Sequence, residues 1–330
     1  MLNIFQLKMN VYKIISIVLL TSVIIIQSYG SSLDTPQYID TIKDRDLSSI
    51  VKHARNLNGI NENYLIKNNE KQYIVSEIKN NLIDFKAYVD NYNAISSVIP
   101  ISKLVQVNYD QKFLIREYIP GEILRIDSDE IIVSKIAEMV HALHNSSIKF
   151  DNKVNARNHI SNMISHNIKF KNHEYEKELG DIVERIYSAM ECMHVDLKPC
   201  HNDLNAKNFI VSDNNVYLID WEFSSLNDPA WDLAYFMTIS LLPQESINIF
   251  LNKYMSLGNI DSDFLDRITA YQPITLIFLS MYLEYSESGD KKFIEILKTQ
   301  SKELYNSTRV QESIKRLENK VIPSTTVSVL

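Results

Sequence analysis

Cysteine is scarce in this 330-residue chain, which contains only Cys192 and Cys200. Two cysteines exclude the multi-disulfide framework of a small secreted scaffold. The pair could close a short loop in an oxidising compartment and would stay reduced in a cytosolic one. With His194 and His201 they offer four potential zinc ligands, but the C-x-H…C-H spacing fits no common zinc module. The cysteines therefore indicate neither a disulfide scaffold nor a zinc finger.

An excess of positive charge is also lacking, because 34 Lys and Arg side chains stand against 41 Asp and Glu side chains, for a formal net charge of −7. Proteins that bind nucleic acids neutralise phosphates with clustered basic side chains, so this balance argues against nucleic acid as a partner. A nucleotide needs only a local pocket and is not excluded. An acidic surface also favours a cationic small molecule through long-range attraction.

Long hydrophobic runs are confined to residues 14–26, where only Ser and Thr interrupt the apolar residues. Lys8 and Lys13 precede this run, and Ser28-Tyr-Gly30 follows it with the small-x-small spacing of a cleavage site. The run is short for a bilayer-spanning helix and typical of a signal-peptide core. We therefore expect residues 1–30 to be a signal-peptide-like or anchor segment of a secreted or membrane-anchored protein. A buried first helix and a misassigned start are the alternatives.

A regular alternation of strands and helices is absent, which argues against a doubly wound parallel sheet. Residues 31–120 are instead rich in strand patterns, and Pro120-Gly121 breaks the pattern at their end. The predicted elements of this region are a hairpin of 63–66 with 72–78, a helix at 82–95, and strands at 101–107 and 112–119.

Residues 121–320 are predicted to be mainly helical, and residues 321–330 to form a loose tail. The first helix, 128–144, opens with capping chemistry at Asp127-Ser-Asp-Glu130 and carries an apolar stripe. The other predicted elements are helices at 174–194, 231–241, 244–255, 264–285 and 291–317, and a second hairpin of 209–211 with 216–219. The chain is thus predicted to adopt an α+β fold with a small β-rich N-terminal lobe and a large helical C-terminal lobe, the outline of a two-lobed kinase.

Three polar side chains around the second hairpin carry the most informative chemistry. Asp203 and Asn208 are five residues apart in His201-Asn-Asp-Leu-Asn-Ala-Lys-Asn208, which matches the H-x-D-x-x-x-x-N spacing of a kinase catalytic loop. Asp220 follows the hairpin at the end of an apolar strand, where it could supply a carboxylate to Mg²⁺. Each residue alone could be a cap or a loop residue. Their order around a hairpin favours phosphoryl transfer, which needs a base, metal ligands and positioning.

The segment 201–236 resembles the choline/ethanolamine kinase and aminoglycoside phosphotransferase superfamily, and particularly bacterial choline kinases. Ile219-Asp-Trp-Glu-Phe-Ser224 is similar to the I-D-W-E-Y-S of that group, and Asn227-Asp-Pro-Ala-Trp-Asp-Leu-Ala234 is similar to its N-D-P-x-W-D-L-A. The resemblance implies a protein-kinase-like fold, ATP as the donor, Mg²⁺ as the cofactor, a small alcohol as the acceptor and a cytoplasmic location.

The same resemblance implies roles for the residues of the catalytic loop. Asp203 would be the catalytic base, and Asn208 and Asp220 would bind the metal ion. His201 would be a structural member of the loop, and Asp232 would brace the loop through hydrogen bonds. The N-terminal lobe, residues 31–120, would bind the nucleotide, and residues 121–320 would carry catalysis and the acceptor.

Two segments of the N-terminal lobe resemble nucleotide-binding elements of the family. Gly59 and Asn61 lie in a segment similar to the turn that covers the phosphates. Glu117 and Ile119 lie in Leu114-Ile-Arg-Glu-Tyr-Ile-Pro-Gly121, which is similar to the strand and linker that contact adenine. These four residues are therefore expected near the nucleotide.

One position of this lobe departs from the family pattern. The second strand should carry a Lys or Arg for the α- and β-phosphates, and Ser76 is aligned there. Lys79 follows three residues later and could replace the missing cation through a one-residue bulge, or Lys67 could substitute for it. The absence of this cation would weaken ATP binding while leaving the metal ligands in place.

The acceptor is expected to contact aromatic and acidic side chains of the C-terminal lobe. A quaternary ammonium such as that of choline binds well to aromatic faces and carboxylates. Trp231 and Tyr235 are the aromatic candidates, and Glu222 and Glu284 are the candidate counter-charges. Further aromatic side chains of the same segments are Phe236, Tyr271, Tyr282 and Tyr285. Core packing is the alternative for each of them, so an aromatic cage requires several to converge near Asp203.

The leading hypothesis is an ATP- and Mg²⁺-dependent phosphotransferase that acts on the hydroxyl of choline or a similar amino alcohol. A kinase of another small acceptor, such as thiamine, a sugar or an aminoglycoside, is the first alternative. A catalytically inactive kinase fold that serves as a binding module is the second, and it is motivated by Ser76 and by the export-like first thirty residues.

Overall fold

The computed structural model describes residues 55–56, 61–68, 71–79, 83–153, 156–168, 173–191, 193–258, 260–287 and 289–320. The predicted leader at 1–30, Gly59, Cys192 and the predicted tail at 321–330 lie outside the described residues. The chain divides into two units, and the division passes through helix α3 (Phe85–Ile95). The first unit contains residues up to Val89 and Ser102–Pro120, and the second contains Asp90–Ile101 and the chain from Gly121 onward.

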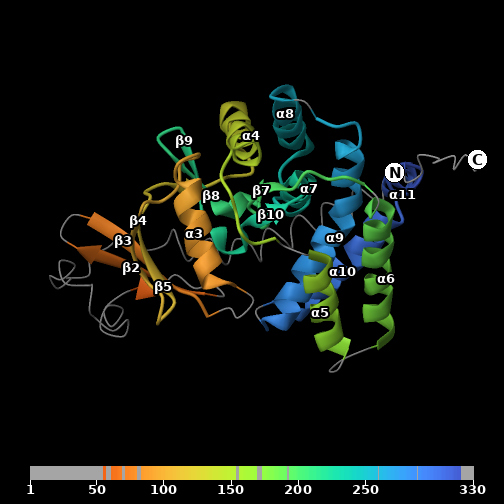
Figure 1. Ribbon diagram of the computed structural model, residues 1–330, viewed down its shortest axis with the longest axis horizontal. Helices are drawn as coiled ribbons and strands as arrows, with labels where there is room; N and C mark the ends of the chain where they lie inside the picture. The colour runs from red at the N-terminus through yellow and green to blue at the C-terminus, as the bar shows by residue number, and fades with distance from the viewer. Residues whose placement is uncertain are drawn as a thin grey trace, which may run out of the picture. The chain divides into compact units, whose positions relative to one another are not determined.

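The first unit is built on an antiparallel five-stranded sheet in the order β1-β2-β3-β5-β4, of which Figure 1 labels β2 to β5. Its strands are β1 (Arg55–Asn56), β2 (Glu62–Asn68), β3 (Lys71–Glu77), β4 (Leu104–Asn108) and β5 (Phe113–Glu117). The predicted first hairpin is confirmed as the pair β2–β3, whose register runs without a shift from Glu62 opposite Glu77 to Asn68 opposite Lys71.

The two faces of this sheet differ in chemistry because successive side chains of a strand point to opposite sides. Tyr73, Val75, Phe113 and Ile115 form a buried apolar cluster on one face, and partly buried apolar side chains of β2 pack against it. The register places three polar side chains of β2, β3 and β5 on the opposite face, together with Ile74 and Leu114. These polar side chains are Asn63, Ser76 and Arg116.

The second unit contains two small sheets that hold the predicted catalytic segment. One sheet has the order β6-β8-β9, with β6 (Glu122–Ile123), β8 (Phe209–Ser212) and β9 (Asn215–Leu218). The other pairs β7 (Lys198–Cys200) with β10 (Ser225–Asn227). Gly121 is required just before β6, because a Cβ there would lie 2.5 Å from the carbonyl oxygen of Val211.

Helices make up the remainder of the second unit. They are α4 (Glu130–His144), α5 (Ala156–Ile168), α6 (His173–Met190), α7 (Pro229–Ile239), α8 (Gln244–Ser256), α9 (Phe264–Tyr285), α10 (Lys291–Tyr305) and α11 (Thr308–Glu318). Helix α9 is the central one, since it packs against α5, α7, α10 and α11 (Figure 1). None of the helices in the described ranges combines the length and the apolarity needed to span a bilayer.

Two predictions about these helices are corrected by the structure. The predicted single helix at 291–317 is two helices, α10 and α11, because the side chain of Ser307 accepts a hydrogen bond from the backbone N–H of Val310 and starts a new helix there. Helix α5 was not predicted, because its sequence is dominated by Asn, His and Ser and shows a weak apolar pattern.

Candidate active site

The predicted catalytic loop leaves strand β7 and turns immediately. Asn202 adopts a left-handed backbone conformation with φ of 67°, which Asn tolerates better than most residues. Asp203 follows, and a 3-10 turn at Ala206–Asn208 leads into β8. The side chain of Asn205 caps that turn by accepting a hydrogen bond from the N–H of Lys207. The sequence between β7 and β8 therefore forms a short loop whose local conformation is fixed by its own Asn side chains.

The side chain of Asp232 holds this loop in place by accepting hydrogen bonds from two backbone N–H groups of the loop. One carboxylate oxygen of the fully buried Asp232 accepts a hydrogen bond from the N–H of His201 at 2.8 Å, and the other accepts one from the N–H of Asn202 at 2.7 Å. The first turn of α7 presents Asp232 because Asp228 caps the helix and Pro229 starts it. Loss of this carboxylate would leave two buried N–H groups without their acceptor.

A buried histidine extends the support beneath Asp232, and sequence reasoning missed it. The Nε2 of His144 lies 3.0 Å from the Asp232 carboxylate, and its Nδ1 lies 2.8 Å from the hydroxyl of Tyr254. His144 ends the apolar stripe of α4, and Tyr254 is on α8. A histidine in register with the apolar positions of a helix was the available signal, but its partners come from distant parts of the chain.

His201 connects the loop to the segment that carries Asp220. The Nε2 of His201 lies 2.8 Å from the carbonyl oxygen of Ile219, and its Nδ1 accepts a hydrogen bond from the N–H of Asp203 at 3.2 Å. A carbonyl can only accept and a backbone N–H can only donate, so these contacts require Nε2 as the donor and Nδ1 as the acceptor. The ring also packs against Trp221, with centroids 4.6 Å apart. The imidazole is thereby occupied as a structural link.

The Asp203 carboxylate is half-buried and surrounded by donors. The Nδ2 groups of Asn205 and Asn208 donate to its two oxygens at 3.1 and 2.9 Å, and the hydroxyl of Tyr235 also donates to it. Burial, followed by the negative charge of Asp220, raises the pKa of Asp203 to about 6. The carboxylate thus has a fixed orientation and a higher proton affinity than an exposed aspartate.

Asn208 and Asp220 provide the oxygen atoms that a magnesium ion prefers. The Nδ2 of Asn208 donates to both the carbonyl and the carboxylate of Asp203, so the Oδ1 is the amide atom that remains for a ligand. Asp220 is exposed, has a left-handed backbone with φ of 67°, and does not cap the turn that follows it. Hard oxygen donors on one amide and one carboxylate suit Mg²⁺, which completes its shell with water and phosphate. The donor set therefore fits this ion.

In the first unit, the predicted cation Lys79 is engaged by carboxylates. Its Nζ lies 3.0 Å from Glu77 and 3.5 Å from Glu62, and the hydrogen bond with Glu77, followed by that residue's charge, raises the pKa of Lys79. The unbroken β2–β3 register contains no bulge that would move Lys79 to position 76. The described pairing therefore gives no support to the proposed bulge, and a phosphate contact of Lys79 stays a prediction. Asn61 accepts a hydrogen bond from the N–H of Lys79 at 3.3 Å.

The predicted adenine-contacting residues lie at the end of β5 and just beyond it. The backbone N–H of Glu117 donates to the carbonyl of Lys103 at 2.9 Å, and its carbonyl accepts from the hydroxyl of Ser102. Ile119 is half-buried in the segment after the strand. The structure holds this segment through backbone hydrogen bonds, and the contacts of these residues with a nucleotide stay a prediction.

Two of the predicted acceptor residues have structural partners. Trp231 is 2% exposed and donates its indole N–H to the carbonyl of Asn202 at 3.2 Å, which leaves little ring surface for a ligand. Glu284 pairs with the buried Lys298 at 2.8 Å, so its charge is already compensated. Glu222 is half-buried. These contacts favour packing and pairing for Trp231 and Glu284.

Tyr235 is as buried as Trp231, at 2% exposed, and its hydroxyl reaches Asp203. Its ring begins a chain of aromatic contacts in which Phe278 and Phe223 are only half-buried. Phe278 contacts Tyr235 at a centroid distance of 6.5 Å and stacks on Tyr282 at 6.2 Å. Phe223 meets Tyr282 edge-on at 5.5 Å. Sequence reasoning missed Phe223 and Phe278, because both lie within apolar patterns that packing alone explains.

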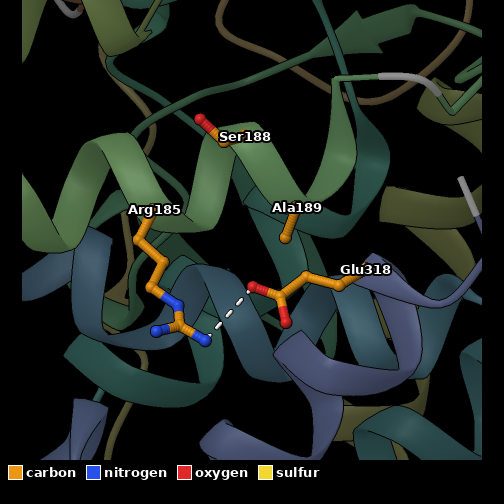
Figure 2. Close-up of a pocket in the computed structure, with 4 residues that line it drawn as sticks. All are labelled: Arg185, Ser188, Ala189 and Glu318. Atoms are coloured by element: carbon orange, nitrogen blue, oxygen red, sulfur yellow. Dashed lines mark ion pairs between the residues drawn. The ribbon is translucent and has the colours of Figure 1, made fainter.

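A surface pocket of the second unit lies apart from these residues. It has a volume of about 320 Å³ and is lined by Arg185, Ser188 and Ala189 of α6 and by Glu318 of α11 (Figure 2). The Arg185 guanidinium reaches to 3.2 Å from the Glu318 carboxylate across it. The described lining contains none of the predicted site residues that the structure describes, and the pocket lies between two helices joined by an ion pair.

Comparisons with known proteins agree with this arrangement. The family model for choline/ethanolamine kinases matches residues 103–317. Protein LicA of Haemophilus influenzae is 25% identical over 219 residues, which cover 63% of this chain and 56% of that protein. The match thus spans little more than half the length of that curated relative.

Two solved structures share the fold. The choline kinase LicA of Streptococcus pneumoniae has a TM-score of 0.67 and 23% identity, covering 82% of this chain and 98% of that one. A structure of LicA in complex with AMP has a TM-score of 0.64 and 25% identity, covering 81% and 91%. The predicted two-lobed kinase-like fold class and the predicted family are therefore confirmed. The chain belongs to the choline/ethanolamine kinase family, whose members are small-molecule kinases.

Proposed function

We propose that the chain is a kinase that transfers the γ-phosphoryl group of ATP to the hydroxyl of a small alcohol in a Mg²⁺-dependent reaction. The observation that carries this proposal is the Asp203 carboxylate, held by donors from Asn205, Asn208 and Tyr235 on a loop that Asp232 fixes from below. Phosphoryl transfer depends on positioning and electrostatics, so a rigid base beside metal ligands is the feature it requires.

Asp203 is the general base of the proposed reaction. Its ionised carboxylate accepts the proton of the acceptor hydroxyl as the oxygen attacks the γ-phosphorus and the bond to the β-phosphate oxygen breaks. The pKa of about 6 keeps most of the carboxylate ionised at neutral pH while making it a stronger base than an exposed aspartate. The three donors orient the carboxylate, and the hydrogen bonds of Asp232 and His201 hold the loop.

Asn208, through Oδ1, and Asp220, through its exposed carboxylate, are the proposed ligands of Mg²⁺. When bound, the ion neutralises the negative charge of the phosphates. Asn208 also donates to Asp203, so one amide side chain links the proposed base to the proposed metal ligand. This link fixes the base relative to the metal position without any further residue.

We assign nucleotide binding to the predicted N-terminal lobe, residues 31–120, with Asn61, Glu117 and Ile119 as proposed contacts. Gly59 belongs to the same proposed turn and lies outside the described residues. The relative that was solved with AMP supports a nucleotide site in this family. Catalysis and the acceptor are assigned to residues 121–320.

Choline or a similar amino alcohol is the proposed acceptor. The ring chain of Tyr235, Phe278 and Tyr282 begins at the proposed base, and aromatic faces attract quaternary ammonium groups. Glu222 is a proposed counter-charge on the same unit. An acceptor whose ammonium group lies over the half-buried Phe278, the most accessible of these three rings, would present its hydroxyl toward Asp203.

A panel of acceptors tests the proposal. The full chain is incubated with Mg-ATP and choline, ethanolamine, thiamine, a sugar, an aminoglycoside or 3,3-dimethylbutanol, the neutral isostere of choline. We expect turnover of choline or ethanolamine and a much lower kcat/KM for the isostere. An equal rate with the isostere would reject recognition of the ammonium group. Turnover of thiamine, the sugar or the aminoglycoside alone would reject the amino alcohol but keep the kinase.

A further inference from the structure

The resemblance to the family leads us to expect a phosphate-binding Lys or Arg at position 76 in the sheet of the first unit, where this chain has a serine. Ser76 lies near the end of β3, is 2% exposed, and lies on the face of the sheet opposite the apolar cluster, directly across from Leu114 of β5. A serine has no charge with which to bind the phosphates of a nucleotide. Either the first unit binds phosphate without a cation on this face, or another strand supplies one.

The neighbouring strand places a guanidinium beside this serine. Arg116 on β5 is opposite Ile74 in the β3–β5 register, which puts it diagonally next to Ser76 on the same face. The Nη2 of Arg116 donates to the Ser76 hydroxyl at 2.7 Å. The positive charge of Arg116 therefore lies at the place where a longer basic side chain at position 76 would begin.

The serine hydroxyl acts as an anchor for this arginine. It accepts from Arg116 and donates to the Oδ1 of Asn63 on β2 at 2.5 Å. The Nδ2 of Asn63 donates in turn to the carbonyl of Asn61 at 3.3 Å. A hydrogen-bonded row thus crosses β5, β3 and β2 and ends at the segment expected to cover the phosphates. An anchored guanidinium loses less side-chain freedom on binding an anion than a free one does.

Lys79 cannot take this role in its observed position. It lies beyond the end of β3, half of its side-chain surface is exposed, and it pairs with Glu77 and Glu62. Lys67 is opposite Gln72, at the other end of the β2–β3 hairpin from Ser76. Arg116 is the basic residue whose described contacts place its charge at Ser76.

We propose that Arg116 of β5 is the residue that binds the nucleotide phosphates in this chain. The cation then lies one strand away from position 76 of β3, where the family pattern leads us to expect it. This inference rests on the proposed function, since it names a ligand of the same nucleotide site. A guanidinium presents several N–H donors in a planar fork and binds two phosphate oxygens at once, which a lysine ammonium does as a point charge.

The test uses calorimetric binding of ADP and of adenosine, which lacks the phosphates, to the full chain. In Arg116→Met we expect ADP affinity to fall about 10- to 100-fold, the range of charge-assisted hydrogen bonds, with adenosine affinity unchanged. Lys79→Met, the matched control, should leave both affinities as in the wild type. Unchanged ADP affinity in Arg116→Met, or a loss in Lys79→Met as large as that in Arg116→Met, would overturn the assignment.

A double variant that exchanges the residues at positions 76 and 116 distinguishes loss of the cation from a folding defect of the single variant. The double variant Ser76→Arg/Arg116→Ser returns the cation to β3, and we expect it to recover ADP affinity to within about threefold of the wild type, because one guanidinium again faces the phosphates. Failure of the swap to recover any affinity that Arg116→Ser loses would contradict the proposal. Wild-type protein that binds adenosine but prefers neither ADP nor ATP would overturn the inference alone. Wild-type protein that binds no nucleotide would overturn the proposed function with it.

Discussion

The loop of the second unit and the sheet of the first unit serve the proposed reaction in different ways. In the loop, the proposed base Asp203, the proposed metal ligand Asn208 and the bracing Asp232 occur at the expected positions along one stretch of chain, and each makes described hydrogen bonds. In the sheet, Ser76 stands at the expected position, and a cation reaches it from the next strand. Residues that act together within one loop can be predicted from their spacing in the sequence. Residues that act together across strands can be predicted only once the strand register is known.

The largest expected effect concerns the loop. Asp203→Asn keeps the shape of the side chain but removes its ability to accept a proton, so kcat should fall by about 10²- to 10⁴-fold. Asp213→Asn, an exposed change in the β8–β9 turn where Asn also tolerates the positive φ of 47°, is the control and should keep wild-type kcat. Steady-state assays of product formation, with circular dichroism to check the fold, would measure this. A kcat within a few-fold of the wild type would remove Asp203 from its proposed role.

The second prediction tests how α7 is held in place beneath the loop. Arg267 pairs with the buried Asp228, the cap of α7, at 2.7 Å and with the exposed Asp261 at 2.9 Å. Arg267→Met leaves Asp228 buried without its charge partner and should lower the free energy of unfolding by about 3–5 kcal/mol. Asp261→Asn removes only the exposed partner and should cost less than about 1 kcal/mol. Urea denaturation measures both, and equal losses would contradict the different weights of the two pairs.

The third prediction concerns the sheet of the first unit. Ser76→Ala removes the hydroxyl that joins Arg116 to Asn63 and should lower the free energy of unfolding by about 1 kcal/mol. Ser97→Ala, whose hydroxyl bonds only locally to the carbonyl of Ala94, should change it by less than half as much. Thermal unfolding of the two variants would compare them. A loss of unfolding free energy as large as that of Arg267→Met would mean that the Ser76 hydrogen bonds stabilise the protein as much as the Arg267–Asp228 pair does.

The smallest expected effect is on pH dependence. Burial, followed by the charge of His144, lowers the pKa of His141 on α4. Between this lowered pKa and the unfolded value near 6.5, the unfolded chain binds more protons, so stability falls as the pH drops through that window. His141→Gln should reduce the fall in urea midpoint between pH 7.5 and pH 5.5. An identical fall in both proteins would show that His141 does not contribute.

Most of the fold was predictable because its longer elements carry strong local patterns. The bounds of α9 agree with the predicted helix at 264–285, since this long segment is apolar on most of its faces. The helix break at Ser307 and the polar helix α5 were missed, because the signals there are a single cap and a weak apolar pattern. Local pattern thus identifies long elements better than their interruptions.

The candidate site was predictable only where its contacts are local in sequence. The link from His144 to Asp232 joins residues 88 apart, and the link from Arg116 to Ser76 joins residues 40 apart. No spacing rule along the chain places such partners together, because pairing depends on strand register and helix packing. The sequence predicts Trp231 as a contact of the acceptor. Its burial and its hydrogen bond to the loop, which favour a packing role, depend on the tertiary structure.

The proposed function requires phosphoryl transfer to a small alcohol at the site around Asp203. The most direct measurement follows the ³¹P NMR spectrum of the full chain with Mg-ATP and choline. We predict a growing phosphomonoester signal matched by an equal amount of ADP, and no such signal with Asp203→Asn. A wild-type chain that binds ADP yet forms no phosphomonoester from any alcohol of the panel would contradict the proposed function and leave a nucleotide-binding module.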